Sequence, residues 1–163
     1  MRRALVLWVA VVSGCAGADN TAAEGKATGS VTGGTPGAMC VANANRARAT
    51  KSEKELESIT LKQVLVHQAD SKNAKDGVSR SREEACLRAA EARDKVVAGA
   101  EFDDAIKNYS DEAGAASRNG MVGTVRREDL VKPVAEAAFA LEVNEMSDVV
   151  ETPFGFHLLL RAP

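Results

Sequence analysis

The chain has 163 residues, enough for one domain of ordinary size with a smaller segment beside it. Hydrophobic residues make up 45% of the chain but aromatic residues only 4%, so a core must be built mainly from alanine, valine and leucine. The formal net charge of −2, without a lysine- or arginine-rich block, argues against a nucleic-acid-binding protein. The absence of GxxxxGK, GxGxxG and HExxH motifs removes the commonest nucleotide-binding and zinc-hydrolase classes.

The N-terminal segment has the pattern of a bacterial lipoprotein signal. Arg2 and Arg3 form its positive start, and residues 4–12 form an apolar run that is too short to span a bilayer. The apolar, small, small, cysteine order that ends at Cys15 resembles the lipobox, at which signal cleavage leaves a lipid-modified cysteine. We therefore predict a signal peptide over residues 1–14 and lipidation of Cys15.

The alternative is a plain secretory signal that is cleaved near Ala16 or Ala18, after which Cys15 is discarded. Both interpretations predict an exported protein. Because alanine rather than aspartate follows Cys15, a lipoprotein in a Gram-negative host would by default be sent to the outer membrane. We therefore expect a lipid-anchored protein at the outer membrane, facing the periplasm.

Residues 15–58 are predicted to contain the lipidated cysteine and a flexible tether. Alanine, glycine, threonine and asparagine dominate the region, with too few aliphatic side chains to offset the entropy of ordering it. After lipidation of Cys15, two cysteines remain in an oxidising compartment, Cys40 and Cys86. Two interpretations stay open, a disulfide that pins the tether to the domain and two free thiols.

After the tether the sequence has the pattern of an α+β domain. Residues 59–66 first alternate and then become solidly apolar, which is typical of a central strand. Ser81 and Glu84 form a capping box, so a helix is predicted to begin at Ser81, to place alanines along one stripe and to end at Gly99. A second, shorter helix is predicted over residues 102–109.

The second half of the domain completes the sheet. A glycine-rich loop leads into a short strand over residues 121–125. Pro133 suits the first turn of a third helix, which Asn144 closes. Residues 147–151 form another strand, and the apolar run around His157 forms the last one. The predicted order is strand, helix, helix, strand, helix, strand, strand, with the first and last strands as neighbours.

A histidine lies inside the last predicted strand. Phe156, Leu158 and Leu160 face one way along it, whereas His157 and Leu159 face the other. A buried histidine is costly unless its ring is hydrogen-bonded, so His157 is either a satisfied core residue or part of a site. The strand alone favours the core interpretation.

Six short sequence blocks favour the interpretation that His157 is part of a site. They cover residues 62–66, 102–110, 120–123, 132–141, 144–147 and 152–157. In this order and spacing they are similar to the parvulin peptidyl-prolyl cis/trans isomerases, over about residues 59–162. The resemblance implies a parvulin-like domain over residues 59–163, an α+β fold with a small antiparallel or mixed four-stranded sheet, flanked by about three or four helices and preceded by a disordered tether.

The resemblance also implies an activity that needs neither a nucleophile nor a cofactor. Rotation about an X-Pro bond crosses a barrier of about 18–20 kcal/mol and takes about 10–100 s unaided. Because twisting makes the carbonyl less polar, a dry apolar pocket that binds the proline ring favours the twisted amide. The expected partners are unfolded or extended proline-containing polypeptides, and a lipid-anchored form resembles the extracytoplasmic parvulin foldases.

By position, the resemblance assigns an apolar proline pocket and a set of polar residues beside it. The pocket residues are Val122, Leu130, Val134 and Phe154, and the polar residues are His157, Gln63, Glu112 and Thr152.

The sequence departs from the family pattern inside this site. Gln63 stands where a first histidine is common, since His67 lies four residues later, and Glu112 stands where a cysteine or aspartate is common. Val134 replaces a frequent phenylalanine, and Leu130 replaces a methionine of similar volume. We therefore expect an isomerase of reduced or shifted activity. The alternatives are a catalytically weak chaperone that binds extended segments in the same groove and, more remotely, a tethered adaptor.

Other chemistries have little support in the sequence. His67, His157, Cys40 and Cys86 lack metal-ligand spacing, so no metal site is expected. In the loop over residues 70–76 lysines alternate with aspartates, which does not match the basic cluster of the phosphate-selective parvulins.

Overall fold

The computed structural model describes residues 34–46 and 56–163. The predicted signal peptide, residues 1–14, and the predicted lipidation site, Cys15, lie outside the described residues. Within the described part of the chain, no helix is both long and apolar enough to cross a membrane. The elements are α1 (Pro36–Ala44), β1 (Ile59–Val66), α2 (Arg82–Val97), α3 (Phe102–Tyr109), β2 (Met121–Val125), α4 (Lys132–Phe139), β3 (Val150–Thr152) and β4 (Gly155–Ala162).

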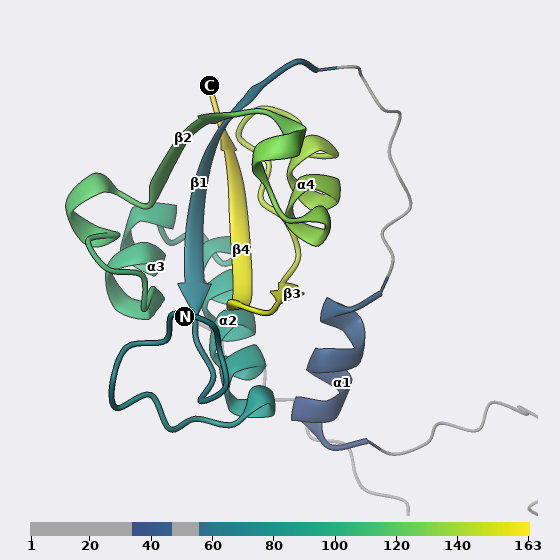
Figure 1. Ribbon diagram of the computed structural model, residues 1–163, viewed down its shortest axis with the longest axis vertical. Helices are drawn as coiled ribbons and strands as arrows, with labels where there is room; N and C mark the ends of the chain where they lie inside the picture. Colours follow the sequence, from purple (N-terminus) through teal and green to yellow (C-terminus); the bar gives the residue numbers. More distant parts are fainter. Residues whose placement is uncertain (1–33, 47–55) are drawn as a thin grey trace, which may run out of the picture. The chain divides into compact units, whose positions relative to one another are not determined.

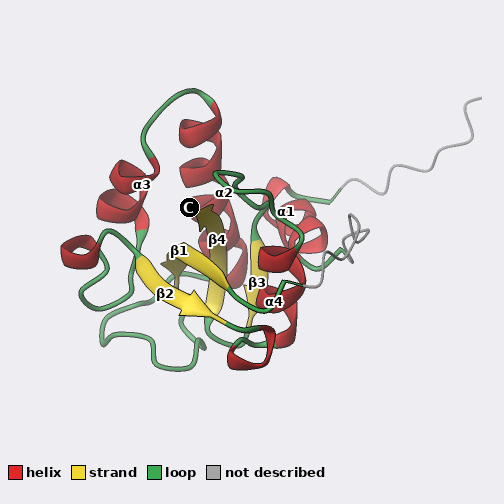
Figure 2. Cartoon of the chain, turned by 90° about the horizontal axis from the view of Figure 1, so that it is seen from above, coloured by secondary structure: helices red, strands yellow, loops and turns green. Residues whose placement is uncertain are grey.

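The four strands form one antiparallel sheet in the order β2-β1-β4-β3. Figure 1 shows β1 and β4 side by side, and Figure 2 shows β2 and β3 at the two edges. In the β1/β4 register Gln63 pairs with Leu159, and Leu65 pairs with His157. The predicted α+β class, the element order and the pairing of the first and last strands are therefore confirmed.

The two faces of the sheet pack against different helices. On one face Val64, Phe156 and Leu158 are fully buried, in a core that also contains residues of α1, α2 and α3. On the opposite face Leu61 and Leu159 are fully buried in a second core with residues of α4. The alternation predicted for the last strand is thus the one observed.

The helix α2 begins and packs as the sequence predicts. Its N-cap is Ser81, whose hydroxyl accepts a hydrogen bond from the N–H of Glu84 at 3.2 Å, while the Glu84 carboxylate accepts one from the Ser81 N–H at 2.7 Å. Ala85, Ala89 and Ala92 are fully buried along one stripe. Because these side chains are small, neighbouring backbones can approach α2 closely.

The tether prediction is wrong for residues 36–44, which form the helix α1. Thr35 caps this helix by accepting a hydrogen bond from the N–H of Ala38 at 3.3 Å, and Pro36 occupies its first turn. Val41 is buried against the core around α2. The segment has only two large apolar side chains, Met39 and Val41, and it is ordered by docking on the alanine-rich surface of α2.

A disulfide between Cys40 and Cys86 joins α1 to α2. Their Cα atoms are 6.0 Å apart across a sequence separation of 46 residues. Of the two interpretations left open by the sequence, the disulfide is the one observed. The remaining parts of the predicted tether, residues 15–33 and 47–55, lie outside the described residues.

The helix α4 ends earlier than predicted, at Phe139 rather than near Asn144. The chain then pairs with β4 through single backbone hydrogen bonds, because the N–H of Asn144 donates to the carbonyl of Arg161 at 2.7 Å and the N–H of Ser147 donates to that of Leu159 at 2.8 Å. Asn144 has a φ of 66°, in the left-handed region, so it turns the chain beside β4 instead of ending the helix. The strand β3 accordingly begins at residue 150 instead of residue 147.

Candidate active site

The four polar residues assigned by resemblance form one continuous chain of hydrogen bonds. Oγ1 of Thr152 lies 2.7 Å from Nε2 of His157, and Nδ1 of the same ring lies 3.1 Å from Oε1 of Gln63. Nε2 of Gln63 donates to Oε2 of Glu112 at 3.2 Å. This chain of hydrogen bonds therefore runs across three strands, β3, β4 and β1, and ends on the loop that follows α3.

The direction of each hydrogen bond follows from what each atom can do. Because Oε1 of Gln63 can only accept, Nδ1 of His157 bears the proton and the other ring nitrogen accepts from the hydroxyl of Thr152. That hydroxyl oxygen in turn accepts from the N–H of Phe154 at 3.1 Å. Every donor along the chain points toward the carboxylate of Glu112, so the bonds polarise one another in the same sense.

The sheet places His157 and Gln63 on the same face. The residue pairs of β1 and β4 put their side chains on the side that also bears Leu159. Thr152 reaches this face because the turn between β3 and β4 is tight and pairs Thr152 with Gly155. Gly155 has a φ of +125°, and a Cβ there would lie 2.3 Å from the carbonyl oxygen of Val66, so only glycine permits this close approach.

The loop after α3 is fixed along the edge of β1, which positions Glu112. The N–H of Asp111 donates to the carbonyl of Leu65 at 2.7 Å, and a carboxylate oxygen of Asp111 accepts from the N–H of His67 at 2.9 Å. Arg80 forms an ion pair with the same Asp111 carboxylate and donates to the carbonyl of His67 at 2.9 Å. These anchoring residues have no local signal in the sequence, because the contacts of Asp111 with Arg80 and His67 span 31 and 44 residues.

Glu112 has a cationic partner that the sequence pattern does not predict. Nη2 of Arg118 lies 2.5 Å from Oε1 of Glu112. The same guanidinium donates to the carbonyls of Ala113 at 2.9 Å and Met121 at 3.1 Å, which fixes its orientation. The only signal in the sequence is a single arginine within a glycine-rich loop, and that pattern does not predict a site.

Burial keeps the ring of His157 neutral. Only 5% of this residue is exposed, and burial, with a smaller contribution from repulsion by His67, lowers its pKa from 6.5 to about 4. The pKa of His67 is also lowered, mainly by burial. His67 therefore lies close enough to act electrostatically on the site, although its Nδ1 atom has no hydrogen-bond partner among the described residues.

The assigned apolar residues lie at different depths. Val134 is 4% exposed and Leu130 is partly buried, and both belong to the core that contains Leu159. Val122 on β2 is 39% exposed, and Phe154 in the turn between β3 and β4 is partly buried. The structure thus places Val134 and Leu130 together on the face that bears His157, with Val122 and Phe154 nearer the surface. Within the described residues no group of three or more histidine, cysteine, aspartate or glutamate side chains is placed to hold a metal.

Comparison with known proteins decides the family. The model of the rotamase family, the PPIC-type PPIase domain, matches residues 64–162, which is more than half of the chain. The chain belongs to the parvulin family. A peptidyl-prolyl cis-trans isomerase pin1 from Rhizopus delemar is 35% identical over 126 residues, covering 74% of this parvulin and 83% of the relative.

Two further similar proteins are matched over only part of their own length. The foldase protein PrsA from Halalkalibacterium halodurans is 36% identical over 72 residues, which cover 44% of this chain and 22% of the foldase. The structure of the peptidyl-prolyl isomerase ESS1 from Candida albicans matches with a TM-score of 0.62 and 26% identity, covering 66% of this chain and 63% of that one. The parvulin therefore spans less than two thirds of both proteins.

Proposed function

We propose that this parvulin is a peptidyl-prolyl cis/trans isomerase that assists the folding of exported proteins. The observation that supports this most directly is the continuous chain from Thr152 through His157 and Gln63 to Glu112, next to the apolar residues Val134 and Leu130. The family membership and the similarity to a protein named as a foldase agree with it.

The proposed mechanism uses binding and exclusion of water. The apolar residues hold the proline ring, and the hydrogen-bonded polar residues beside it offer a fixed surface that is uncharged at Thr152, His157 and Gln63. A planar amide loses favourable solvation in such an environment, whereas the twisted amide, which is less polar, loses less. Because the ring of His157 is neutral and both its nitrogens are hydrogen-bonded, its role is to orient the site without transferring a proton.

Gln63 replaces the first histidine of the family in this arrangement. Its amide both accepts from His157 and donates to Glu112, so it connects the same two neighbours that a histidine could connect. Unlike histidine, it does not titrate. We therefore propose that the rate is nearly independent of pH across the neutral range, and that it is lower than in parvulins with two histidines.

The direct test is a proline-limited refolding assay with the full-length protein, together with binding of a proline-containing peptide. The expected result is acceleration of refolding above the spontaneous rate. Peptide binding without any acceleration would instead favour the alternative function, a chaperone or peptide-binding module. The replacement of a frequent phenylalanine by Val134, which leaves less apolar surface around the proline ring, is the observation that keeps this alternative in view.

We further propose that the protein is anchored by a lipid on Cys15 at the outer membrane, facing the periplasm. The support is the order of charged, apolar and small residues before Cys15. Mass spectrometry of the N-terminal peptide should show a diacylglyceryl cysteine, and Cys15→Ser should move the protein from the membrane fraction to the soluble fraction. Cleavage beyond residue 15 in the wild-type protein would contradict the proposal and favour the plain secretory signal.

A further inference from the structure

Glu151, the central residue of β3, holds that strand from the face opposite the site. Along β3 its neighbours Val150 and Thr152 are both buried, and Thr152 donates to His157. Because side chains alternate along a strand, Glu151 points away from the site. Its side chain is nevertheless only 12% exposed, since α1 and α2 cover it.

Three hydrogen bonds from two helices converge on the carboxylate of Glu151. Nε and Nη2 of Arg82, the first residue of α2, donate to its two oxygens at 2.5 and 2.8 Å. Nδ2 of Asn45, the C-cap of α1, donates to Oε2. The Arg82 side chain is 48% exposed, but its two-pronged contact with the largely covered carboxylate restrains geometry more than a single contact does.

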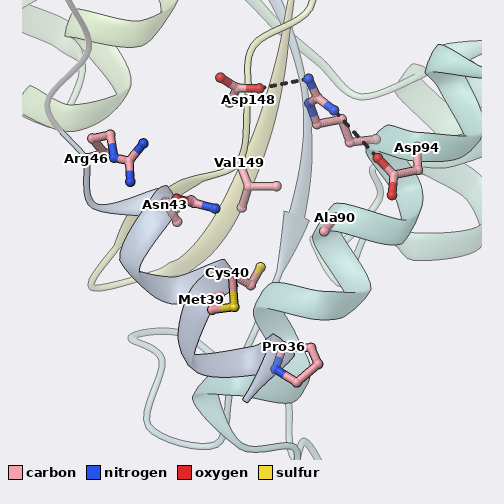
Figure 3. Close-up of a pocket in the computed structure, with 11 residues that line it drawn as sticks. Pro36, Met39, Cys40, Asn43, Arg46, Ala90, Asp94, Asp148 and Val149 are labelled. Carbon is pink, nitrogen blue, oxygen red and sulfur yellow. Dashed lines mark ion pairs between the residues drawn. The ribbon is translucent and has the colours of Figure 1, made fainter. Parts of the chain in front are cut away.

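The strand β3 needs this restraint because its own pairing is limited. It has three residues, lies at the edge of the sheet and, within the described part of the chain, pairs only with β4. The segment just before it also contacts α2, because Asp148 forms an ion pair with Arg93 at 2.9 Å. Figure 3 shows this ion pair on one side of the pocket between α1 and α2, with Cys40 of α1 on the other side.

The position of Asn45 depends on the docking of α1. The side-chain amide of Asn45 also donates to the carbonyl of Val41 at 3.1 Å, which fixes it to the end of the helix. The Cys40–Cys86 disulfide attaches that helix to α2. The helix α1 lies outside the region, residues 64–162, that matches the family model, so this support is an addition to the domain.

We infer that Asn45 and Glu151 are positioning residues for the active site, and that α1 supports the site through them. By holding β3 in place they fix the hydroxyl of Thr152 at hydrogen-bond distance from Nε2 of His157. The consequence for catalysis rests on the proposed isomerase function, but the consequence for the His157 hydrogen bond does not.

The test uses Asn45→Ala in the full-length protein, with Met39→Ala as a control on an exposed position of the same helix. We expect Asn45→Ala to lower kcat about threefold with little change in KM, as for a weakened hydrogen bond, and to shift the ¹⁵N signal of His157 Nε2. Met39→Ala should change neither. Cys40→Ala combined with Cys86→Ala should reproduce both effects, because α1 is then no longer covalently attached.

A double-mutant cycle with Thr152→Val separates positioning from a general loss of stability. In the Thr152→Val background, Asn45→Ala should have no further effect on kcat, although it still lowers the unfolding temperature. Equal effects in both backgrounds, or an unchanged His157 ¹⁵N signal in Asn45→Ala, would overturn the inference. If the wild-type protein shows no isomerase activity, a shifted ¹⁵N signal still supports the positioning role while the proposed function fails.

Discussion

Nδ1 of His157 donates a hydrogen bond to Oε1 of Gln63 across 3.1 Å, joining the central strands β4 and β1 in the candidate site. An amide thus occupies the position at which the first histidine of the family is common. Because an amide does not titrate and the ring of His157 is neutral, the hydrogen-bond directions in this site are fixed at neutral pH.

The first prediction concerns Gln63. Gln63→Leu leaves the buried Nδ1–H of His157 without an acceptor and removes the donor to Glu112, so we expect a loss of about 1–3 kcal/mol in the free energy of unfolding and about a tenfold lower kcat/KM. Gln63→His, which can still contact both neighbours, should instead raise the rate. Chemical denaturation and the refolding assay measure the two effects, and equal rates in both variants would contradict this role for Gln63.

The second prediction separates catalysis from binding at His157. His157→Ala should reduce kcat more than it reduces the affinity for a proline-containing peptide, because the ring orients the twisted amide. Thr152→Val, a change of similar volume that removes only the hydroxyl, should show the same split to a smaller degree, about tenfold in kcat. Peptide titration and the refolding assay provide the comparison. Equal losses of rate and affinity in His157→Ala would mean that the ring is purely structural.

The third prediction concerns stability against pH. The folded-state pKa of His157, about 4, lies below its usual value of 6.5, so the unfolded chain takes up a proton first as the pH falls. The contribution of the neutral His157 ring to the free energy of unfolding is therefore fully present above about pH 6.5. It decreases by about 3 kcal/mol as the pH falls to about 4. Urea unfolding over this range tests the prediction. In His157→Ala the decrease should be clearly smaller, and an unchanged decrease would assign it to other groups such as His67.

The fourth prediction compares two glycines next to the site. Gly120 has a φ of +64°, and a Cβ there would lie 2.6 Å from both the carbonyl oxygen of Gln63 and Cδ1 of Ile106. Gly123 has a φ of +110°, but a Cβ added there would meet no atom of the described residues within 4 Å beyond its own chain neighbours. Gly120→Ala should therefore destabilise the protein by about 3 kcal/mol and disturb Gln63, whereas Gly123→Ala should cost only about 1–2 kcal/mol of backbone strain. Thermal unfolding distinguishes the two, and equal losses would exclude a steric role for Gly120.

Much of the domain could be predicted from the sequence because its signals are local. The capping box at Ser81, the apolar side of residues 102–109 and the strand at residues 121–125 each depend on neighbours a few positions away. The alternation around His157 also assigns its side chain to a face of the sheet. The resemblance then supplied Gln63, Glu112 and Thr152 as its companions, which the hydrogen-bond chain connects.

The tertiary structure decided the features that depend on distant residues. The helix over residues 36–44 is held against the domain by the alanine surface of α2 and by the disulfide to Cys86. The tie between Asn45 and Glu151 spans 106 residues, and the ion pair of Arg118 with Glu112 depends on how a glycine-rich loop folds. The sequence by itself predicted most helices and strands of the domain from short-range pattern, and the order and spacing of its blocks pointed to the family, which in turn supplied the candidate site residues. Only the packed structure determined the direction of the hydrogen bonds and the contacts of Glu151 that hold Thr152 in place, because both arise between elements far apart in the chain.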